Sequence, residues 1–243
     1  MAKTSLLAHA WEVYTRNFWL IVLMAVPGLF GLAIPLLVGT PSFVALGGAY
    51  LRTNSIPDLT PLSSGLMVLS LIVSLFLMSF AIVNINLVIK SQRTLTQIGN
   101  EVAKSATTTT LSVFWIFLMA SISLLIIQLL TYEYGLQSVL APLLSLAIGL
   151  AILFVPTAMV IDDVRPYRAL QRSINTVLSK SPLVLLWLLV AFVSLVAVDA
   201  VFLFVLPHPF ASWLVLIVNS VLIHPYLIVL LGQIYISKYT ILE

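Results

Sequence analysis

Three polar residues late in the chain, Asp199, Asn219 and His224, are of types that could do chemistry inside a membrane. Asp199 is the one charged residue between 181 and 237, and Asn219 and His224 follow it within the same apolar region. A carboxylate costs about 2.5–3.5 kcal/mol at the centre of a spanning helix, so its position needs a physical reason. Two interpretations stay open: a hydrogen-bonded Asp199 that holds two helices together, and a proton or cation site shared with Asn219 or His224.

No other group of residues indicates a reaction. The chain has no cysteine, which excludes disulfides and thiolate sites, and its three histidines are far apart in the sequence. It contains no zinc-protease, nucleophile-elbow or phosphate-loop motif, and no carboxylate pair suited to acid–base hydrolysis. We therefore predict a protein that is not an enzyme, with no catalytic residues, no metal and no cofactor.

Long uncharged helices must position the three polar residues. Of 243 residues, 61% are hydrophobic and only 8% are charged, whereas soluble domains have about 25% charged residues. Six uncharged stretches are long enough to cross a bilayer as helices. We predict an all-α, polytopic integral membrane protein, a single domain over 1–243, with six spans near 18–38, 62–89, 110–130, 138–161, 182–206 and 210–236.

The distribution of basic residues predicts the orientation. With the N-terminus inside, ten of the 11 Lys and Arg residues fall in cytoplasmic segments and only Arg52 falls outside. Cytoplasmic loops of membrane proteins carry such an excess. We expect a multi-pass protein of the cell membrane with both termini in the cytoplasm, and the same distribution argues against binding to nucleic acid.

Proline and glycine predict irregularities in and between the spans. Kinks are expected in the first, fourth and sixth spans, since proline removes a backbone donor. The residues concerned are Pro27, Gly28, Gly31, Pro35, Pro156 and Pro225. The apolar segment 39–61 is expected to be a long outer loop on the membrane surface or between helices. Amides such as Asn84 and Asn86 are expected to bond across helices.

Three amphipathic segments, near 7–18, 95–106 and 167–181, precede the odd-numbered spans. Their apolar residues recur at helical spacing, which is typical of short helices that lie in the membrane interface. We expect three cytoplasmic-side surface helices, with Arg16, Arg168, Arg172 and Lys180 facing anionic lipid headgroups. The chain is then either three repeats of a surface helix and a hairpin, or an ordinary membrane protein with basic amphipathic flanks.

A short segment resembles a known group of membrane proteins. The pattern runs from Phe154-Val155-Pro156 through Asp162-Asp163, Ala169-Leu170 and Ser173 to Lys180-Ser181-Pro182. It is similar to a group of six-helix prokaryotic membrane proteins that includes the membrane domain of some glycerophosphodiester phosphodiesterases. The resemblance implies a six-helix fold; the phosphodiesterase domain is absent, so no activity is implied.

Two functions fit these observations. The first is a transporter-like or lipid-interacting membrane protein, with a polar cavity enclosed by the kinked helices and Asp199. The second is a non-catalytic scaffold that organises other membrane proteins, its surface helices touching the lipid headgroups. A cavity lined by Asp199, Asn219 and His224 would favour the first function, and a solid core would favour the second.

Overall fold

The computed structural model describes residues 6–37, 43–46, 49–52, 61–94, 100–135, 139–207 and 210–237. Helices dominate this part of the chain, with one short strand pair. The elements are α1 (Leu6–Arg16), α2 (Phe18–Leu37), β1 (Phe43–Leu46), β2 (Ala49–Arg52), α3 (Pro61–Thr94), α4 (Asn100–Glu133), α5 (Leu140–Ile152), α6 (Val155–Asp162), α7 (Pro166–Ser179), α8 (Ser181–Val205), α9 (Phe210–Val218), the π-helical turn η1 (Asn219–Ile223) and α10 (His224–Ile236).

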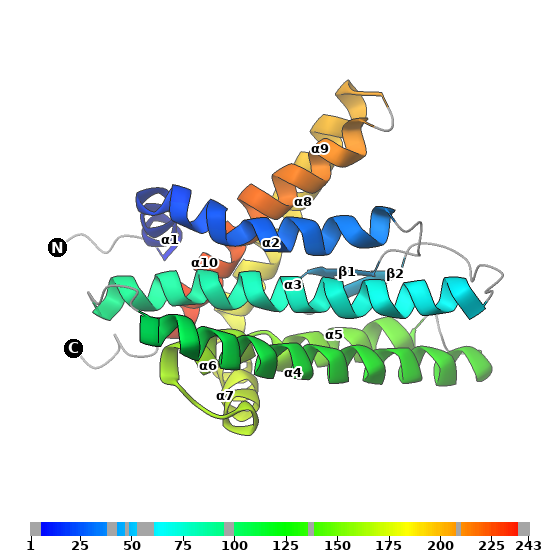
Figure 1. The fold of residues 1–243 in the computed structure, drawn as a ribbon, viewed down its shortest axis with the longest axis horizontal. Helices are drawn as coiled ribbons and strands as arrows, with labels where there is room; N and C mark the ends of the chain where they lie inside the picture. Colours follow the sequence, from blue (N-terminus) through cyan, green and yellow to red (C-terminus); the bar gives the residue numbers. More distant parts are fainter. Residues whose placement is uncertain are drawn as a thin grey trace.

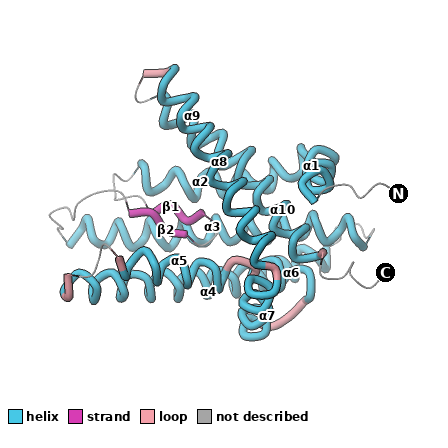
Figure 2. The backbone as a smooth tube through the Cα atoms, turned by 180° about the vertical axis from the view of Figure 1, so that it is seen from behind, coloured by secondary structure: helices cyan, strands magenta, loops and turns pink. Residues whose placement is uncertain are grey.

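The long helices form a bundle from which one hairpin departs. Helices α2, α3, α4 and α5 run side by side along the long axis of the molecule, and α1 and α7 lie at the end where both chain termini are found (Figure 1). The α8–α9 hairpin projects away from the bundle at a steep angle, as the rear view also shows (Figure 2). The largest buried cluster is contributed by α3, α4, α6, α8 and α10, so the core lies at the base of that hairpin.

Five helical segments are long and apolar enough to cross a membrane, and the bent pair α1 and α2 could supply a sixth. The five run over 65–91, 106–131, 140–162, 181–202 and 210–236. They coincide with the second to sixth predicted spans, which confirms the helical, multi-span pattern at the level of length and composition.

The N-terminal surface helix is separate from the first span, as predicted. The axes of α1 and α2 differ by 86°, and the Asn17 side chain donates to the Val13 carbonyl at the bend (3.1 Å). The Tyr14 hydroxyl donates to the Leu222 carbonyl of η1 (3.2 Å), and burial raises the Tyr14 pKa to about 12. Helix α1 is therefore packed against the bundle by its aromatic face.

The prediction of a second surface helix near 95–106 is wrong, because this segment does not form a helix separate from the third span. Asn100 to Glu133 form one continuous helix, α4, that includes the third span, and 95–99 lie outside the described residues. No proline or glycine occurs within α4, so nothing bends the amphipathic segment away from the span. Only α1 and α7 are distinct surface helices in the described chain, which leaves the proposed threefold repeat without its second copy of this element.

The first predicted span is not broken by its prolines, since α2 is continuous through Pro27 and Pro35; the kink expected there stays a prediction. The glycines serve packing instead. A Cβ at Gly31 would lie 3.0 Å from the Ser74 carbonyl oxygen of α3, and one at Gly28 would lie 3.2 Å from the Ala81 Cβ. The Ser74 hydroxyl donates to the Gly31 carbonyl (2.5 Å). The two helices therefore touch backbone to backbone, as small residues permit.

The fourth and sixth spans are irregular where proline predicts it. The fourth is divided into α5 and α6 just before Pro156, and the backbone N–H of Phe154, at the break, donates to the Ser173 hydroxyl of α7 (3.0 Å). The sixth contains the π-helical turn η1 directly before His224-Pro225. Such turns place extra backbone in a helix and recur at functional sites.

The predicted outer loop over 39–61 is wrong in part. Residues 43–46 and 49–52 form an antiparallel strand pair in which Phe43 pairs with Arg52 and Leu46 with Ala49. Two short apolar runs joined by Gly47-Gly48 are typical of such a hairpin. Strand β2 contacts α5, so this segment is tucked against the helices. The rest of 39–61 lies outside the described residues.

Candidate functional site

The three predicted polar residues lie close to one another where α8 meets η1 and α10. Asp199 is on α8, Asn219 begins η1 and His224 begins α10. The Asn219 side-chain amide donates to the Asp199 carboxylate (3.3 Å). His224 is 7% exposed and lines the same cavity as Asp199. The structure thus brings Asp199 and Asn219 into contact and places His224 on the cavity wall.

This cavity has a volume of about 340 Å³ and lies between α8 and the helices α3, α4, α6 and α10. Its volume is within the range of small-molecule sites, about 300–1,000 Å³. The α8 residues that line it follow one helix face: Trp187, Leu188, Ala191, Phe192, Leu195, Val196 and Asp199. The other walls are formed by residues of α3, α4, α6 and α10, among them Asn86, Phe117, Thr157 and Leu227.

The walls of the cavity are mainly apolar and partly aromatic. Phe117, Trp187 and Phe192 line it. The indole N–H of Trp187 donates to the Leu227 carbonyl (2.9 Å), so this ring is held in one orientation. Phe192 is 67% exposed and Val196 is 48% exposed although both line the cavity. The cavity therefore opens sideways along α8, toward the surface that would face lipid.

Two further polar residues lie on the walls: Asn86, an amide expected from the sequence to bond across helices, and Thr157, which no signal in the sequence distinguishes. The Asn86 carbonyl oxygen and the Thr157 hydroxyl are buried and have no hydrogen-bond partner in the described part of the chain. The Asn86 amide donates to the Ile82 carbonyl of its own helix (2.9 Å), not across helices as predicted. Buried polar groups without partners are rare in folded proteins, so each needs a physical explanation.

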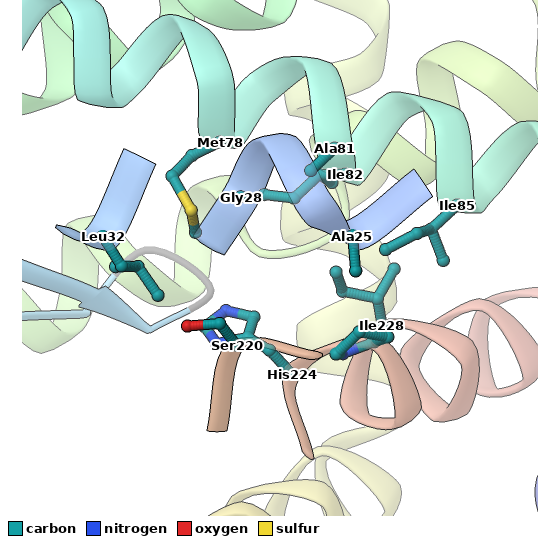
Figure 3. A pocket seen from close by; sticks show the side chains of 11 residues that line it. Ala25, Gly28, Leu32, Met78, Ala81, Ile82, Ile85, Ser220, His224 and Ile228 are labelled. Carbon is teal, nitrogen blue, oxygen red and sulfur yellow. The ribbon is translucent and has the colours of Figure 1, made fainter. Parts of the chain in front are cut away.

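A much smaller cavity of about 10 Å³ lies on the other side of His224, among α2, α3, η1 and α10. Figure 3 shows Ser220 and His224 on one side of it, with Gly28 and Met78 on the other. The space is about that of one water molecule. His224 contributes to the walls of both cavities, as do Ile82 and Ile228.

A hydrogen-bonded group of three side chains lies beyond one end of the large cavity. It consists of Asp162, Arg172 and Tyr235 and is called the polar clasp below. The Asp162 carboxylate accepts hydrogen bonds from the Arg172 guanidinium and from the Tyr235 hydroxyl, the latter at 2.6 Å. Burial alone would lower the Arg172 pKa, but Asp162 and Tyr235 together raise it above the ordinary arginine value. The clasp joins α6, α7 and α10 about one helical turn past the cavity-lining residues Thr157 and Leu231.

The basic residues predicted to face anionic headgroups divide into two pairs. Arg16 and Arg168 are exposed. Arg172 belongs to the clasp, and the Lys180 ammonium donates to the Ile234 carbonyl and the Ser237 hydroxyl, both at 2.8 Å. Arg172 and Lys180 thus join helices to one another. Lys90 likewise pairs with Asp163 (2.5 Å).

The residues that the structure describes contain no group of three or more His, Cys, Asp or Glu side chains that could hold a metal ion. The polar groups of the large cavity suit hydrogen bonding and charge pairing. Comparison with known proteins gives no further guidance, because no family model, curated protein or solved structure matches the chain.

Proposed function

We propose that this chain is an integral membrane protein that binds a lipid-like molecule in the cavity beneath α8. The observation that carries the proposal is the apolar cavity of about 340 Å³, open along the exposed residues Phe192 and Val196. A chain in the bilayer could enter it sideways without passing through water. A cavity in this place favours the lipid-interacting function over the scaffold function, for which a solid core is expected.

The surface of the helices supports a location in the membrane. Large apolar side chains are exposed along α2, α3, α4, α8 and α9, including Trp19, Leu69, Met119, Leu189 and Phe204. Soluble monomers rarely expose continuous apolar surfaces of this extent. The basic residues lie at the ends of these helices, so we place both termini in the cytoplasm of the cell and the lipid-binding cavity within the bilayer.

The polar clasp supports entry from the side. Asp162, Arg172 and Tyr235 tie α6, α7 and α10 together at the cytoplasmic end in the proposed orientation. Opening this group is costly on one side, because the Asp162 side chain is only 5% exposed and would be left as a buried charge without its partners, whereas the Arg172 side chain is 42% exposed. An apolar molecule therefore meets less resistance along α8 than through this end.

Blocking the cavity tests the proposal. Ala191 lines the cavity, and Ala191→Phe would fill part of it. The purified protein in uncharged detergent is exposed to a photoreactive diazirine analogue of dodecanol, and the labelled peptides are identified by mass spectrometry. We expect label on the cavity-lining peptides of α8 and α10, and loss of most of it in Ala191→Phe.

The matched control is Ala197→Phe. Ala197 is an exposed residue of the same helix and does not line the cavity, so its replacement should leave the labelling unchanged. Label spread evenly over the lipid-facing helices, or equal labelling of both variants, would contradict the proposed function.

A further inference from the structure

The charge of the cavity lining selects among lipid-like molecules. Asp199 is the one acidic residue among the lining residues, and none of them is Lys or Arg. A molecule with a carboxylate or phosphate group would meet Asp199 and find no fixed cation. The lining therefore disfavours anionic lipids, although these are the molecules that a basic protein surface would attract.

The side chains of Asp199 and Asn219 contain oxygen atoms that could accept further hydrogen bonds. The Asn219 amide donates to one Asp199 oxygen (3.3 Å), whereas an ionised carboxylate offers about four acceptor positions. The Asn219 carbonyl oxygen is buried and has no hydrogen-bond partner among the residues that the structure describes. The Asp199 carboxylate thus keeps acceptor positions after its bond to Asn219, and of these two residues it is the one that lines the cavity.

A second unpartnered acceptor lies on the opposite wall. The Asn86 carbonyl oxygen is buried and unpaired within the described chain, as is the Thr157 hydroxyl, and both residues line the cavity. Aromatic rings also line the cavity, those of Phe117, Trp187 and Phe192. Aromatic faces attract cations through their quadrupoles, so the apolar part of the lining also favours positive charge.

From these observations we infer that the cavity binds a cationic amphiphile: an apolar chain that carries a protonated amine, with the ammonium paired to the Asp199 carboxylate. The inference rests on the proposed function and adds the chemical class of the ligand. An ammonium group supplies three donors and the positive charge that a carboxylate in a spanning helix requires. A carboxylate-bearing amphiphile has neither.

Competition among three amphiphiles of equal chain length tests the class. Dodecylamine, dodecanol and dodecanoate are titrated at pH 7 against the photoreactive dodecanol label, using the full-length protein in uncharged detergent. We expect dodecylamine to compete at a concentration about tenfold lower than dodecanol, as suits a desolvated charge pair, and dodecanoate to compete least well.

The Asp199→Asn variant should abolish the advantage of dodecylamine over dodecanol while the label itself still binds, because the substitution removes the charge and keeps the shape. Asp199→Glu, which keeps the charge, should retain the advantage. Asp163→Asn is the control, since Asp163 is an exposed carboxylate paired to Lys90 away from the cavity. The three amphiphiles partition unequally into detergent. Because this partition is the same for every variant, it cancels when the variants are compared.

The two proposals fail in different ways. Equal competition by dodecylamine and dodecanol in the unmodified protein, or an unchanged advantage in Asp199→Asn, would overturn the cationic class. The proposed function would then still stand if Ala191→Phe blocks the label. Labelling of the cavity-lining peptides that is as strong in Ala191→Phe as in the unmodified protein would overturn the proposed function itself.

Discussion

A single hydrogen bond at Phe154 shows how a break in a helix is made stable. Proline at 156 ends the regular pattern of α5, and the Phe154 N–H is buried at the break. The Ser173 hydroxyl of α7 accepts it at 3.0 Å. Ser173 is fully buried, so no water could replace it. Helix α7 is therefore held on the bundle by satisfying a donor that the break exposes.

Ser173→Ala should destabilise the protein by about 1–2 kcal/mol, because a buried donor would lose its partner. The measurement is thermal unfolding in detergent, where about 2–4 °C of melting temperature corresponds to each kcal/mol for a chain of this size. Ser179→Ala is the control on the same helix, since the Ser179 hydroxyl contacts only the Thr176 carbonyl at 3.4 Å. Equal melting temperatures for the two variants would refute this role.

At the scale of elements, the packing of α2 on α3 depends on two glycines. The Gly31 position leaves no room for a side chain, because a Cβ would stand 3.0 Å from a backbone oxygen of α3. The oxygen belongs to Ser74, whose hydroxyl bonds back to Gly31. The helices can separate only by losing this bond and the contacts around it.

Gly31→Val should cost about 1–3 kcal/mol, the usual cost of overpacking. Gly65→Val on α3 is the control, because nothing lies within 4 Å of a Cβ built there. Both variants can be compared by the temperature at which the detergent-solubilised protein aggregates. A loss of stability of the same size in both would show that valine itself, and not the contact with Ser74, is responsible.

Helix α7 has a third face, of small residues, besides the apolar and basic faces that its sequence predicts. Its sequence predicts an apolar stripe and a basic face, and Tyr167 and Leu178 of that stripe are indeed exposed at 79% and 72%. The face against the bundle is instead made of small residues, Ala169, Ser173 and Thr176, which are buried. Small side chains allow close approach and provide the hydroxyl that reaches Phe154. These residues fall within the 154–182 segment whose family resemblance stays a prediction.

At the scale of the whole molecule, the proposed orientation places α7 inside the cell and the α4–α5 turn outside. The chain contains no cysteine, so a single introduced thiol can be labelled without background. Tyr167 on α7 and Tyr134 after α4 are 79% and 73% exposed, which makes them a matched pair for substitution.

In intact cells, a membrane-impermeant maleimide should label Tyr134→Cys at once, and should label Tyr167→Cys only after the membrane is permeabilised. The positive-inside distribution is the physical reason. Labelling is read from the mass shift of the purified protein. The reverse order of labelling would show that the orientation is opposite to the proposed one. Equal labelling of both variants in intact cells would argue against a membrane barrier between positions 134 and 167.

Much of the fold follows from local properties of the chain. The long apolar helices follow from runs without charge, and the breaks at Pro156 and Pro225 follow from a missing backbone donor. The contact of Asp199 with Asn219 could be predicted because a short turn joins their helices and sets both at similar depth. The predicted boundary between a surface helix and the third span is wrong, because amphipathicity alone does not end a helix and no proline or glycine occurs in α4.

The sequence by itself determined the helices, their number to within one, and the polar pair that they bring together, because charge, hydropathy and proline act over a few residues. Only the tertiary structure decided that α8 leans away from α3, α4 and α6 and leaves a cavity, and that Asn86 and Thr157 face it without partners. It also decided that Arg172 and Lys180 join helices. Such features depend on which faces of distant helices meet, and no local pattern encodes that choice.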